Sequence, residues 1–275
     1  MSPPLRTIAV VNMKGGVGKT TTAVHIAAGL VARGRRVLLV DADPQGNVGH
    51  ILGLTAPVTI KEVMLGTAPL LSAIIPAGDR QGLSVIVATP AAFALESQLA
   101  GTVQRETLLA RRLKESTAFD AIIIDSSPAM NLMTYNALLC ADELVMPVGM
   151  DTMALAGARQ TLDGVNEIRS LWPDRRLRLA AVVPTTVNLN THGSRAVLQA
   201  LQADAEMGPA LFTRGIRQCI DLTYAAAAHQ TIWEYAPGSR AAEDYAALVD
   251  HLDGTHPSQT ATYGEEATDI QRSAL

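Results

Sequence analysis

The stretch Met13-Lys14-Gly15-Gly16-Val17-Gly18-Lys19-Thr20-Thr21 separates an apolar run at residues 7–11 from a helix-forming segment at residues 21–33. The apolar run is predicted to be a buried strand, and the segment after the loop a helix. A glycine-rich turn between a strand and a helix presents backbone N–H groups and the positive end of the helix dipole to an anion. Residues 13–21 are therefore predicted to bind a phosphate group.

The same stretch departs from the Walker A pattern, G-x-x-x-x-G-K-[ST]. Its end, Gly18-Lys19-Thr20, fits the pattern, but Met13 stands in place of the first glycine and Lys14 adds a second lysine. In such a loop Lys19 is expected to reach the β- and γ-phosphates, and the Thr20 hydroxyl to bind Mg²⁺. Lys14 has no role in that pattern. Either it is a solvated loop lysine, or it reaches a nucleotide bound by a second subunit.

Further apolar runs alternate with helical stretches along the chain. They are residues 36–41, 83–88, 121–125, 143–148 and 177–183. Continuous Val, Ile and Leu runs separated by helices indicate an α/β fold, with a mostly parallel, twisted sheet and helices on both faces. Ligands of such sheets bind at the carboxyl ends of the strands, where the glycine-rich loop, Asp41 and Asp125 all fall.

Asp125 ends a run of apolar residues, which is the Walker B pattern. In this position it is expected to hold Mg²⁺ through a water molecule while Thr20 binds the ion directly. The alternative is that Asp125 is a strand-end acid that caps the next turn. The two acids and the loop together predict ATP and Mg²⁺ as cofactors.

With its two lysines, the loop resembles that of the deviant Walker A ATPases, the ParA/MinD family of P-loop NTPases. The family includes ParA/Soj, MinD and the nitrogenase iron protein. The stretch Asp41-Ala42-Asp43-Pro44-Gln45-Gly46-Asn47 matches the D-x-D-P-Q-x-N motif of ParA/Soj proteins residue for residue, and residues 234–245 resemble their closing segment, E-Y-x-P-x-S-R-x-A-x-x-Y. The resemblance covers roughly residues 5–250. It implies a dimer that encloses two ATP molecules, with Lys14 acting in trans.

The resemblance also implies roles for the acids. Asp41 is expected near the metal, and Asp43 is expected to position or activate the attacking water, which suits a loose phosphoryl-transfer transition state. Asn47 either supports the same loop or is an ordinary turn residue. Ser127 stands where ParA relatives usually have proline, in D-x-P-P, which predicts a change in loop mobility but no loss of a ligand.

The site residues expected from motif and resemblance fall into three groups. The catalytic residues are Lys14, Lys19 and Asp43. The metal ligands are Thr20, Asp41 and Asp125. The nucleotide-binding residues are Lys14, Gly15, Gly16, Val17, Gly18, Lys19, Thr20, Thr21 and Asp41, with Pro184 and Arg214 expected near the adenine by analogy.

The function that the resemblance implies is a ParA-like ATPase that hydrolyses ATP slowly to ADP and phosphate. Its ATP-bound homodimer is expected to bind DNA without sequence preference, and a ParB-like or other adaptor protein to stimulate hydrolysis. The protein would segregate or position chromosome or plasmid DNA. It is expected to be cytoplasmic and associated with the nucleoid, without contact to a membrane.

A net charge of −4 and a pI of about 5.9 argue against a globally basic nucleic-acid binder. DNA affinity would then come from sparse arginines that dimerisation gathers on one surface, and it would be salt-sensitive. The candidates are Arg195, Arg214, Arg217 and Arg240, with Arg175, Arg176 and Arg178 less favoured.

Other functions remain open on the sequence. One is a nucleotide-gated positioning or regulatory module for a protein cargo, MinD-like or microcompartment-type, in which DNA plays no part. Another is a metabolic kinase or synthetase on the same fold. A MinD-like membrane anchor is disfavoured because residues 256–275 carry no apolar stripe. An iron-protein relative is disfavoured because Cys140 and Cys219 match no metal-binding spacing and are expected to be buried, reduced thiols.

The domain organisation expected is a single deviant Walker A ATPase domain over residues 1–253. Residues 254–275 are small, polar and weakly patterned, and they are expected to form a disordered C-terminal tail.

Overall fold

A computed structural model describes residues 5–114, 116, 118–175 and 177–254 of the 275-residue chain. Arg176 and the expected tail beyond Gly254 therefore lie outside the described residues. The last described helix ends at Asp253, with Gly254 in the left-handed conformation that commonly ends a helix.

The described residues form a seven-stranded sheet in the order β3-β4-β2-β5-β1-β6-β7. All neighbouring strands are parallel except β3, which pairs with β4 in the antiparallel sense. This confirms the predicted α/β fold with a mostly parallel sheet. The strands are β1 (Arg6–Val10), β2 (Val37–Asp41), β3 (Ile75–Pro76), β4 (Leu83–Ile86), β5 (Ala121–Asp125), β6 (Glu143–Val148) and β7 (Arg178–Pro184).

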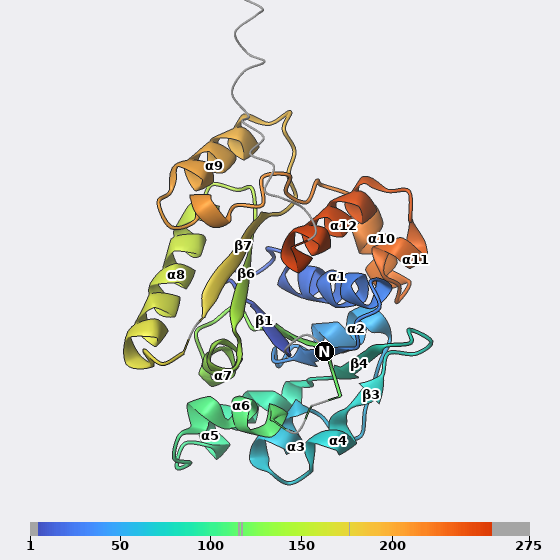
Figure 1. Ribbon diagram of the computed structural model, residues 1–275, viewed down its shortest axis with the longest axis vertical. Helices are drawn as coiled ribbons and strands as arrows, with labels where there is room; N and C mark the ends of the chain where they lie inside the picture. The colour runs from blue at the N-terminus through green and yellow to red at the C-terminus, as the bar shows by residue number, and fades with distance from the viewer. Residues whose placement is uncertain (1–4, 115, 117, 176, 255–275) are drawn as a thin grey trace, which may run out of the picture.

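Helices cover the sheet on both sides (Figure 1). The α-helices are α1 (Lys19–Ala32), α2 (Asn47–Leu52), α3 (Ile60–Leu65), α4 (Leu70–Ala73), α5 (Leu95–Gln98), α6 (Leu108–Leu113), α7 (Leu132–Cys140), α8 (Ala154–Leu171), α9 (His192–Ala203), α10 (Asp221–Ala227), α11 (Ile232–Tyr235) and α12 (Arg240–Asp253). Short 3₁₀ helices are η1 (Pro90–Ala94), η2 (Arg105–Thr107) and η3 (Gly208–Ala210).

The core lies on both faces of the sheet because side chains alternate along each strand. Ile8 and Val10 of β1 pack with α1, α2, α11 and α12. Ala9 of β1 and Val11, which follows the strand, pack with α3, α6 and α7. A third cluster joins α8 and α9 to β6 and β7. Both faces of the central strands are therefore buried from solvent, which explains the continuous apolar runs of these strands.

One strand end and one whole strand show where the structure differs from the sequence prediction. Strand β4 ends at Ile86 rather than residue 88, because the carbonyl of Val87 accepts a hydrogen bond from the backbone N–H of Ile60 at the start of α3 (3.0 Å). Strand β3 was not predicted, since a two-residue strand has no sequence periodicity.

Candidate nucleotide site

The phosphate loop joins β1 to α1 at the carboxyl edge of the sheet. Gly16 and Gly18 have φ values of 75° and 82°, in the left-handed region that only glycine enters at little cost. Helix α1 begins at Lys19, two residues earlier than predicted, and no described side chain caps its first turn. The N–H groups of that turn are therefore available to an anion.

The phosphate loop also has open space next to the backbone of Gly15 and Gly16. A Cβ atom built on Gly15 or Gly16 would meet no described atom within 4 Å. This space lies beside the N-terminus of α1, as a bound phosphate group requires. The geometry thus fits the predicted phosphate site at residues 13–21.

Met13 shows why the first Walker A glycine is dispensable in this chain. Among the described non-glycine residues, positive φ occurs at Gln104, Thr186 and His229, so Met13 has an ordinary negative φ. Its backbone N–H donates to the Thr161 hydroxyl on α8 (3.0 Å). A side chain is thus tolerated at position 13, and the backbone there is bound to α8.

Asp41 and Asp125 end the neighbouring strands β2 and β5 and lie opposite one another in the parallel register. Both carboxylates are fully buried. The two oxygens of Asp125 lack a hydrogen-bond partner among the described residues. Burial raises the pKa of Asp125 to about 7, with the nearby Thr20 side chain and Lys19 acting in the opposite direction. A buried, unpartnered carboxylate is a suitable oxygen donor for a divalent cation.

Asp41 has a second task, which is to shape the loop after β2. Its oxygens accept hydrogen bonds from the backbone N–H groups of Asp43 (3.0 Å) and Val48 (3.1 Å). Burial, together with the charge of Asp125, raises its pKa well above the usual range. Asp43 is itself almost fully buried and accepts a hydrogen bond from the Gln45 N–H (2.9 Å). Asn47, for which two roles were left open, begins α2.

Lys19 lies among these acids. Its ammonium donates to the carbonyl oxygen of Lys14 (3.0 Å) across the loop. Burial lowers its pKa, and the charges of Asp125 and Asp43 oppose that shift. The structure thus brings Lys19, Asp43 and Asp125 together.

Lys14 points away from the loop toward the residues that follow β6. Its ammonium forms an ion pair with the Asp151 carboxylate. Hydrogen bonding from Lys14 lowers the pKa of Asp151. The side chains of Lys14 and Asp151 are 25% and 56% exposed, so the pair lies at the surface. A surface ion pair contributes little to stability, about 0–1 kcal/mol, and breaks at little cost.

Pro184 and Arg214, expected near the adenine, lie on segments that meet beside the loop. The Thr185 hydroxyl donates to the Val17 carbonyl (3.0 Å), and the Ile216 N–H donates to the Pro184 carbonyl (2.7 Å). The Arg214 guanidinium donates instead to Asp244 on α12 (2.8 Å). The segments are thus close to the loop, while the Arg214 side chain is bound to α12.

The arginines proposed for DNA differ in their partners. Arg217 pairs with Asp244 and Glu243, as Arg214 does. Arg195 and Arg240 are exposed and belong to none of the ion pairs found among residues 5–254 with their gaps. Arg178 begins β7 and therefore lies at the opposite, amino edge of the sheet, where it pairs with Glu143 (2.6 Å).

Ser127 stands where the resemblance led us to expect proline, and it is buried in a hydrogen-bonded turn. Its hydroxyl lies 3.1 Å from that of Thr134 and accepts a hydrogen bond from the Asn131 amide (2.9 Å). Asn131 in turn caps α7 by accepting from the Thr134 N–H (3.0 Å). Side-chain hydrogen bonds therefore order this turn without a proline at position 127.

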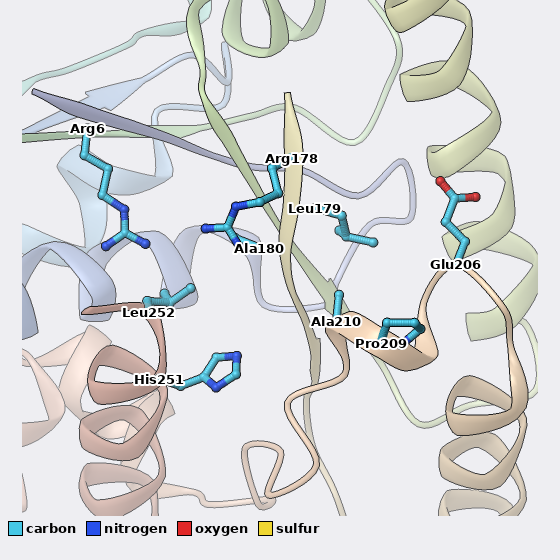
Figure 2. A pocket seen from close by; sticks show the side chains of 9 residues that line it. All are labelled: Arg6, Arg178, Leu179, Ala180, Glu206, Pro209, Ala210, His251 and Leu252. Atoms are coloured by element: carbon cyan, nitrogen blue, oxygen red, sulfur yellow. The ribbon is translucent and has the colours of Figure 1, made fainter. Parts of the chain in front are cut away.

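A cavity of about 340 Å³ lies at the amino edge of the sheet, away from the loop. Arg6 and Arg178 extend into it above His251 of α12 (Figure 2). Both guanidinium groups donate to Glu143, so their charge is already offset. Ligands of parallel sheets bind at the other edge, and this cavity is therefore a poor nucleotide site.

The sequence reasoning missed Asn12, Asp151 and Thr161. Asp151 could have been found, because it follows the predicted strand at residues 143–148 and so falls at the same edge as the loop. Asn12 adjoins the loop directly. Thr161 carries no local signal, since it lies in the middle of helix α8. Cys140 and Cys219 are both free. Burial raises the pKa of the Cys140 thiol to about 12, as expected of a buried thiol, whereas Cys219 is only partly buried.

The sheet, the glycine-rich loop and the strand-end acids define a P-loop nucleotide-binding protein. The AAA domain family matches residues 5–177. The chromosome-partitioning ATPase Soj of Thermus thermophilus is 35% identical over 249 residues, 90% of this chain and 95% of Soj. The chromosome partitioning protein ParA of Caulobacter vibrioides is 36% identical over 207 residues, 73% of this chain and 76% of ParA.

A solved structure described as cobyrinic acid a,c-diamide synthase from Mycobacterium smegmatis, with bound ADP and magnesium, is also similar. It is 31% identical with a TM-score of 0.77, over 93% of this chain and 99% of the other. The chain therefore belongs to the ParA/Soj family of P-loop ATPases. Within the described residues, no helix combines the length and apolar character needed to span a membrane.

Proposed function

We propose that this protein is a partition-type ATPase that binds Mg²⁺ and ATP, dimerises in the ATP state and binds DNA without sequence preference as that dimer. The observation that carries the proposal is the pair of lysines in one loop: Lys19 turns into the phosphate site, whereas Lys14 turns out of it. Membership of the ParA/Soj family supports it. The expected location is the cytoplasm, on the nucleoid.

The nucleotide would bind at residues 15–21. The free N–H groups of the first turn of α1 would contact its phosphates. Thr20 and Asp125 would hold Mg²⁺, which neutralises charge on the phosphates. The unpartnered oxygens of Asp125 support that assignment. Asp41 lies beside Asp125 and holds the following loop, so it would fix the position of Asp43 near the metal.

Asp43 would position or activate the attacking water. It is buried, close enough to Lys19 and Asp125 to influence their pKa values, and held in a turn by its own neighbours. Phosphoryl transfer needs little covalent chemistry from the protein, mainly an aligned water and neutralised charge. Slow hydrolysis follows if the water is held well only when a partner protein orders this loop.

Lys14 would change partners on dimerisation. In the single chain it pairs with Asp151 at the surface, an interaction that is cheap to break. A nucleotide in a second subunit carries more negative charge and sits in a more enclosed site, so it would compete well for the ammonium. Two such contacts, one from each subunit, would link dimerisation to bound ATP.

The first test is dimerisation of the Lys14→Ala variant, measured by size-exclusion chromatography with light scattering in the presence of Mg²⁺ and ATP. We expect the ATP-dependent dimer to weaken about a hundredfold or more, because one charged hydrogen bond is lost from each subunit, while ATP still binds. Lys114→Ala, at an exposed lysine that follows α6, is the control. An undiminished ATP-dependent dimer in the Lys14 variant would exclude the trans role.

The Asp43→Asn variant tests the water-handling role when ATP turnover is measured beside the same dimerisation assay. Asparagine keeps an oxygen that can accept the Gln45 N–H and removes the charge. We expect hydrolysis to fall by about two orders of magnitude or more and the ATP dimer to persist. Normal turnover would remove Asp43 from catalysis.

A DNA shift assay, with and without ATP and at two salt concentrations, separates this proposal from a nucleotide-gated module for a protein cargo. Binding that needs ATP and weakens with salt supports DNA partition. No binding under any condition supports the module.

The likeness to the M. smegmatis synthase structure favours a second candidate, an ATP-dependent amide synthase. Such an enzyme would hydrolyse ATP only with an acceptor carboxylate and an amine donor. ATP turnover measured with DNA, and separately with cobyrinic acid and glutamine, distinguishes the two functions.

A further inference from the structure

We infer that Asn12 and Thr161 are positioning residues for Lys14. They bind the backbone at the start of the phosphate loop, so that Lys14 leaves the loop along α8 and cannot enter its own phosphate site. The inference rests on the proposed action of Lys14 at a second subunit.

Asn12 fixes the Lys14 backbone. Its side chain is 1% exposed, and its amide nitrogen donates to the Pro147 carbonyl of β6 (2.7 Å). That bond orients the amide, so that its oxygen accepts the Lys14 N–H at 2.8 Å. The Lys14 backbone is thereby tied to β6, the strand that neighbours β1 on the side of α8.

Thr161 fixes the Met13 backbone from α8. The threonine is fully buried, and its hydroxyl donates to the Gly157 carbonyl one turn earlier (2.7 Å). The hydroxyl oxygen then accepts the Met13 N–H (3.0 Å). The N–H groups of both Met13 and Lys14 are therefore directed into the protein, and neither is available to a phosphate.

Gly157 gives the Lys14 side chain its path. A Cβ atom on Gly157 would lie 3.1 Å from the Lys14 Cβ and 3.6 Å from its Cδ. The lysine stem thus rests directly on the backbone of α8, and its ammonium reaches Asp151 just before that helix. Asn12, Thr161 and Gly157 together set the direction in which the charge leaves the loop.

This arrangement also accounts for the missing first glycine. A backbone position with negative φ and a buried N–H needs no glycine, and it does need a hydrogen-bond acceptor. Thr161 supplies that acceptor for Met13. The departure from the Walker A pattern and the second lysine are thus one structural feature.

The test compares Thr161→Val with Thr161→Ser, since valine keeps the shape and removes the hydroxyl while serine keeps the hydroxyl. We expect Thr161→Val to weaken the ATP-dependent dimer about five- to tenfold, because Lys14 of each subunit is held less firmly in the direction of its partner. Binding of a fluorescent ATP analogue by the monomer should change little. Thr161→Ser should restore dimerisation. Thr7→Val makes the same chemical change at a buried threonine on β1 and is the control.

Gly157→Ala is the second variant, chosen because its melting temperature distinguishes a local effect on Lys14 from unfolding. Alanine is favoured over glycine inside a helix, so the melting temperature should not fall. The added Cβ displaces the Lys14 stem, and we expect a weaker dimer of unchanged or higher thermal stability.

Lys14→Ala, measured in parallel, separates the two hypotheses. If Lys14→Ala dimerises normally, the proposed role of Lys14 fails. If Lys14→Ala loses the dimer while Thr161→Val and Gly157→Ala dimerise like the wild type, the positioning role alone is overturned. A Thr161→Ser variant as weak as Thr161→Val would also overturn it, because the hydroxyl would then not be the active group.

Discussion

At the scale of single residues, the nucleotide site contains carboxylates whose burial costs free energy. Few neighbouring groups offset that cost. Asp41 and Asp125 lie side by side at the ends of β2 and β5, and both have raised pKa values because they are buried. Asp41 offsets part of this cost by accepting two backbone N–H groups. Asp125 has no such partner among the described residues, so it gains most from a bound cation.

A further buried titratable residue, His25, lies on α1, the helix that follows the phosphate loop. Its Nδ1 lies 2.7 Å from the Thr21 carbonyl, and its Nε2 accepts the Ile232 N–H (2.9 Å). The ring also stacks on Tyr245 of α12, with ring centroids 4.5 Å apart. Accepting at Nε2 requires the neutral imidazole, so protonation would break this link between α1 and α11.

His25 should therefore make the protein sensitive to acid. Burial lowers its pKa from 6.5 to about 4, although the Thr21 carbonyl and Glu234 oppose the shift. The unfolded chain then binds a proton before the folded chain does. The free energy of unfolding should fall as the pH drops from 6.5 toward 4, by about 1.4 kcal/mol per unit and about 3 kcal/mol in all.

Urea unfolding of the wild type and of His25→Gln at pH 7, 6, 5 and 4 measures this effect. Other carboxylates titrate equally in both proteins, so the difference between the two curves isolates His25. The wild type should lose its advantage over the variant as the pH falls. A difference that stays constant with pH would show that His25 does not bind the proton on unfolding.

At the scale of elements, local pattern accounts for the strands and the loop. The apolar runs of β1, β2, β5 and β6 were predictable because each strand is buried on both faces. The phosphate site was open to prediction because its glycines and Lys19 follow β1 and the acid Asp125 ends β5. What local pattern could not supply is contact between distant segments. Thr161 forms a hydrogen bond with Met13, which is 148 residues away in the sequence, and Lys14 forms one with Asp151, which is 137 residues away.

The arginines Arg214 and Arg217 show the same limit. The sequence made both arginines candidates for DNA contact, but it did not identify their ion-pair partner. The structure places the fully buried carboxylate of Asp244 between them, and Asp244 comes from helix α12. Burial alone would raise its pKa, but hydrogen bonds from Arg217 and Arg214 outweigh that effect, and the pKa is lowered. Asp244 also accepts the Arg217 backbone N–H (2.9 Å), so it ties the loop after η3 to α12.

Replacing Asp244 by alanine should destabilise the protein. Loss of one partner of a fully buried pair costs about 3–5 kcal/mol, but these two arginines are 45% and 40% exposed and can return to water. We therefore expect a loss of about 2 kcal/mol in urea unfolding, between the buried and the surface limits. Glu243→Ala removes the adjacent, exposed carboxylate from the same arginines and should cost less than about 0.5 kcal/mol. Equal losses in the two variants would contradict this account.

At the scale of the whole molecule, the proposed binding to DNA has to be compatible with a net charge of −4. Arg214 and Arg217 are largely offset by Asp244 and Glu243, and Arg178 by Glu143 at the far edge of the sheet. Among the described residues, no ion pair offsets the positive charges of Arg195 and Arg240. A dimer would present two copies of each, so the proposed DNA surface depends mainly on these two positions.

This reasoning predicts how DNA binding should respond to salt. Each phosphate that an arginine neutralises releases counterions, so the slope of log affinity against log salt grows with the number of contacts, by about 0.9 for each. Arg195→Ala and Arg240→Ala should each weaken binding of the ATP-bound protein to duplex DNA and reduce the slope by about 1 for each lost contact. Fluorescence anisotropy between roughly 50 and 200 mM salt measures it.

Arg178→Ala is the matched control, because it removes one arginine at the opposite edge of the sheet, where Glu143 already offsets the charge. Its slope should equal that of the wild type, since a residue that touches no phosphate releases no counterion. A reduced slope in Arg178→Ala, with Arg195→Ala and Arg240→Ala unchanged, would place the DNA at the amino edge of the sheet. That result would separate DNA binding from the edge at which two nucleotide sites can meet, so the DNA surface could not be continuous with the ATP-dependent dimer interface.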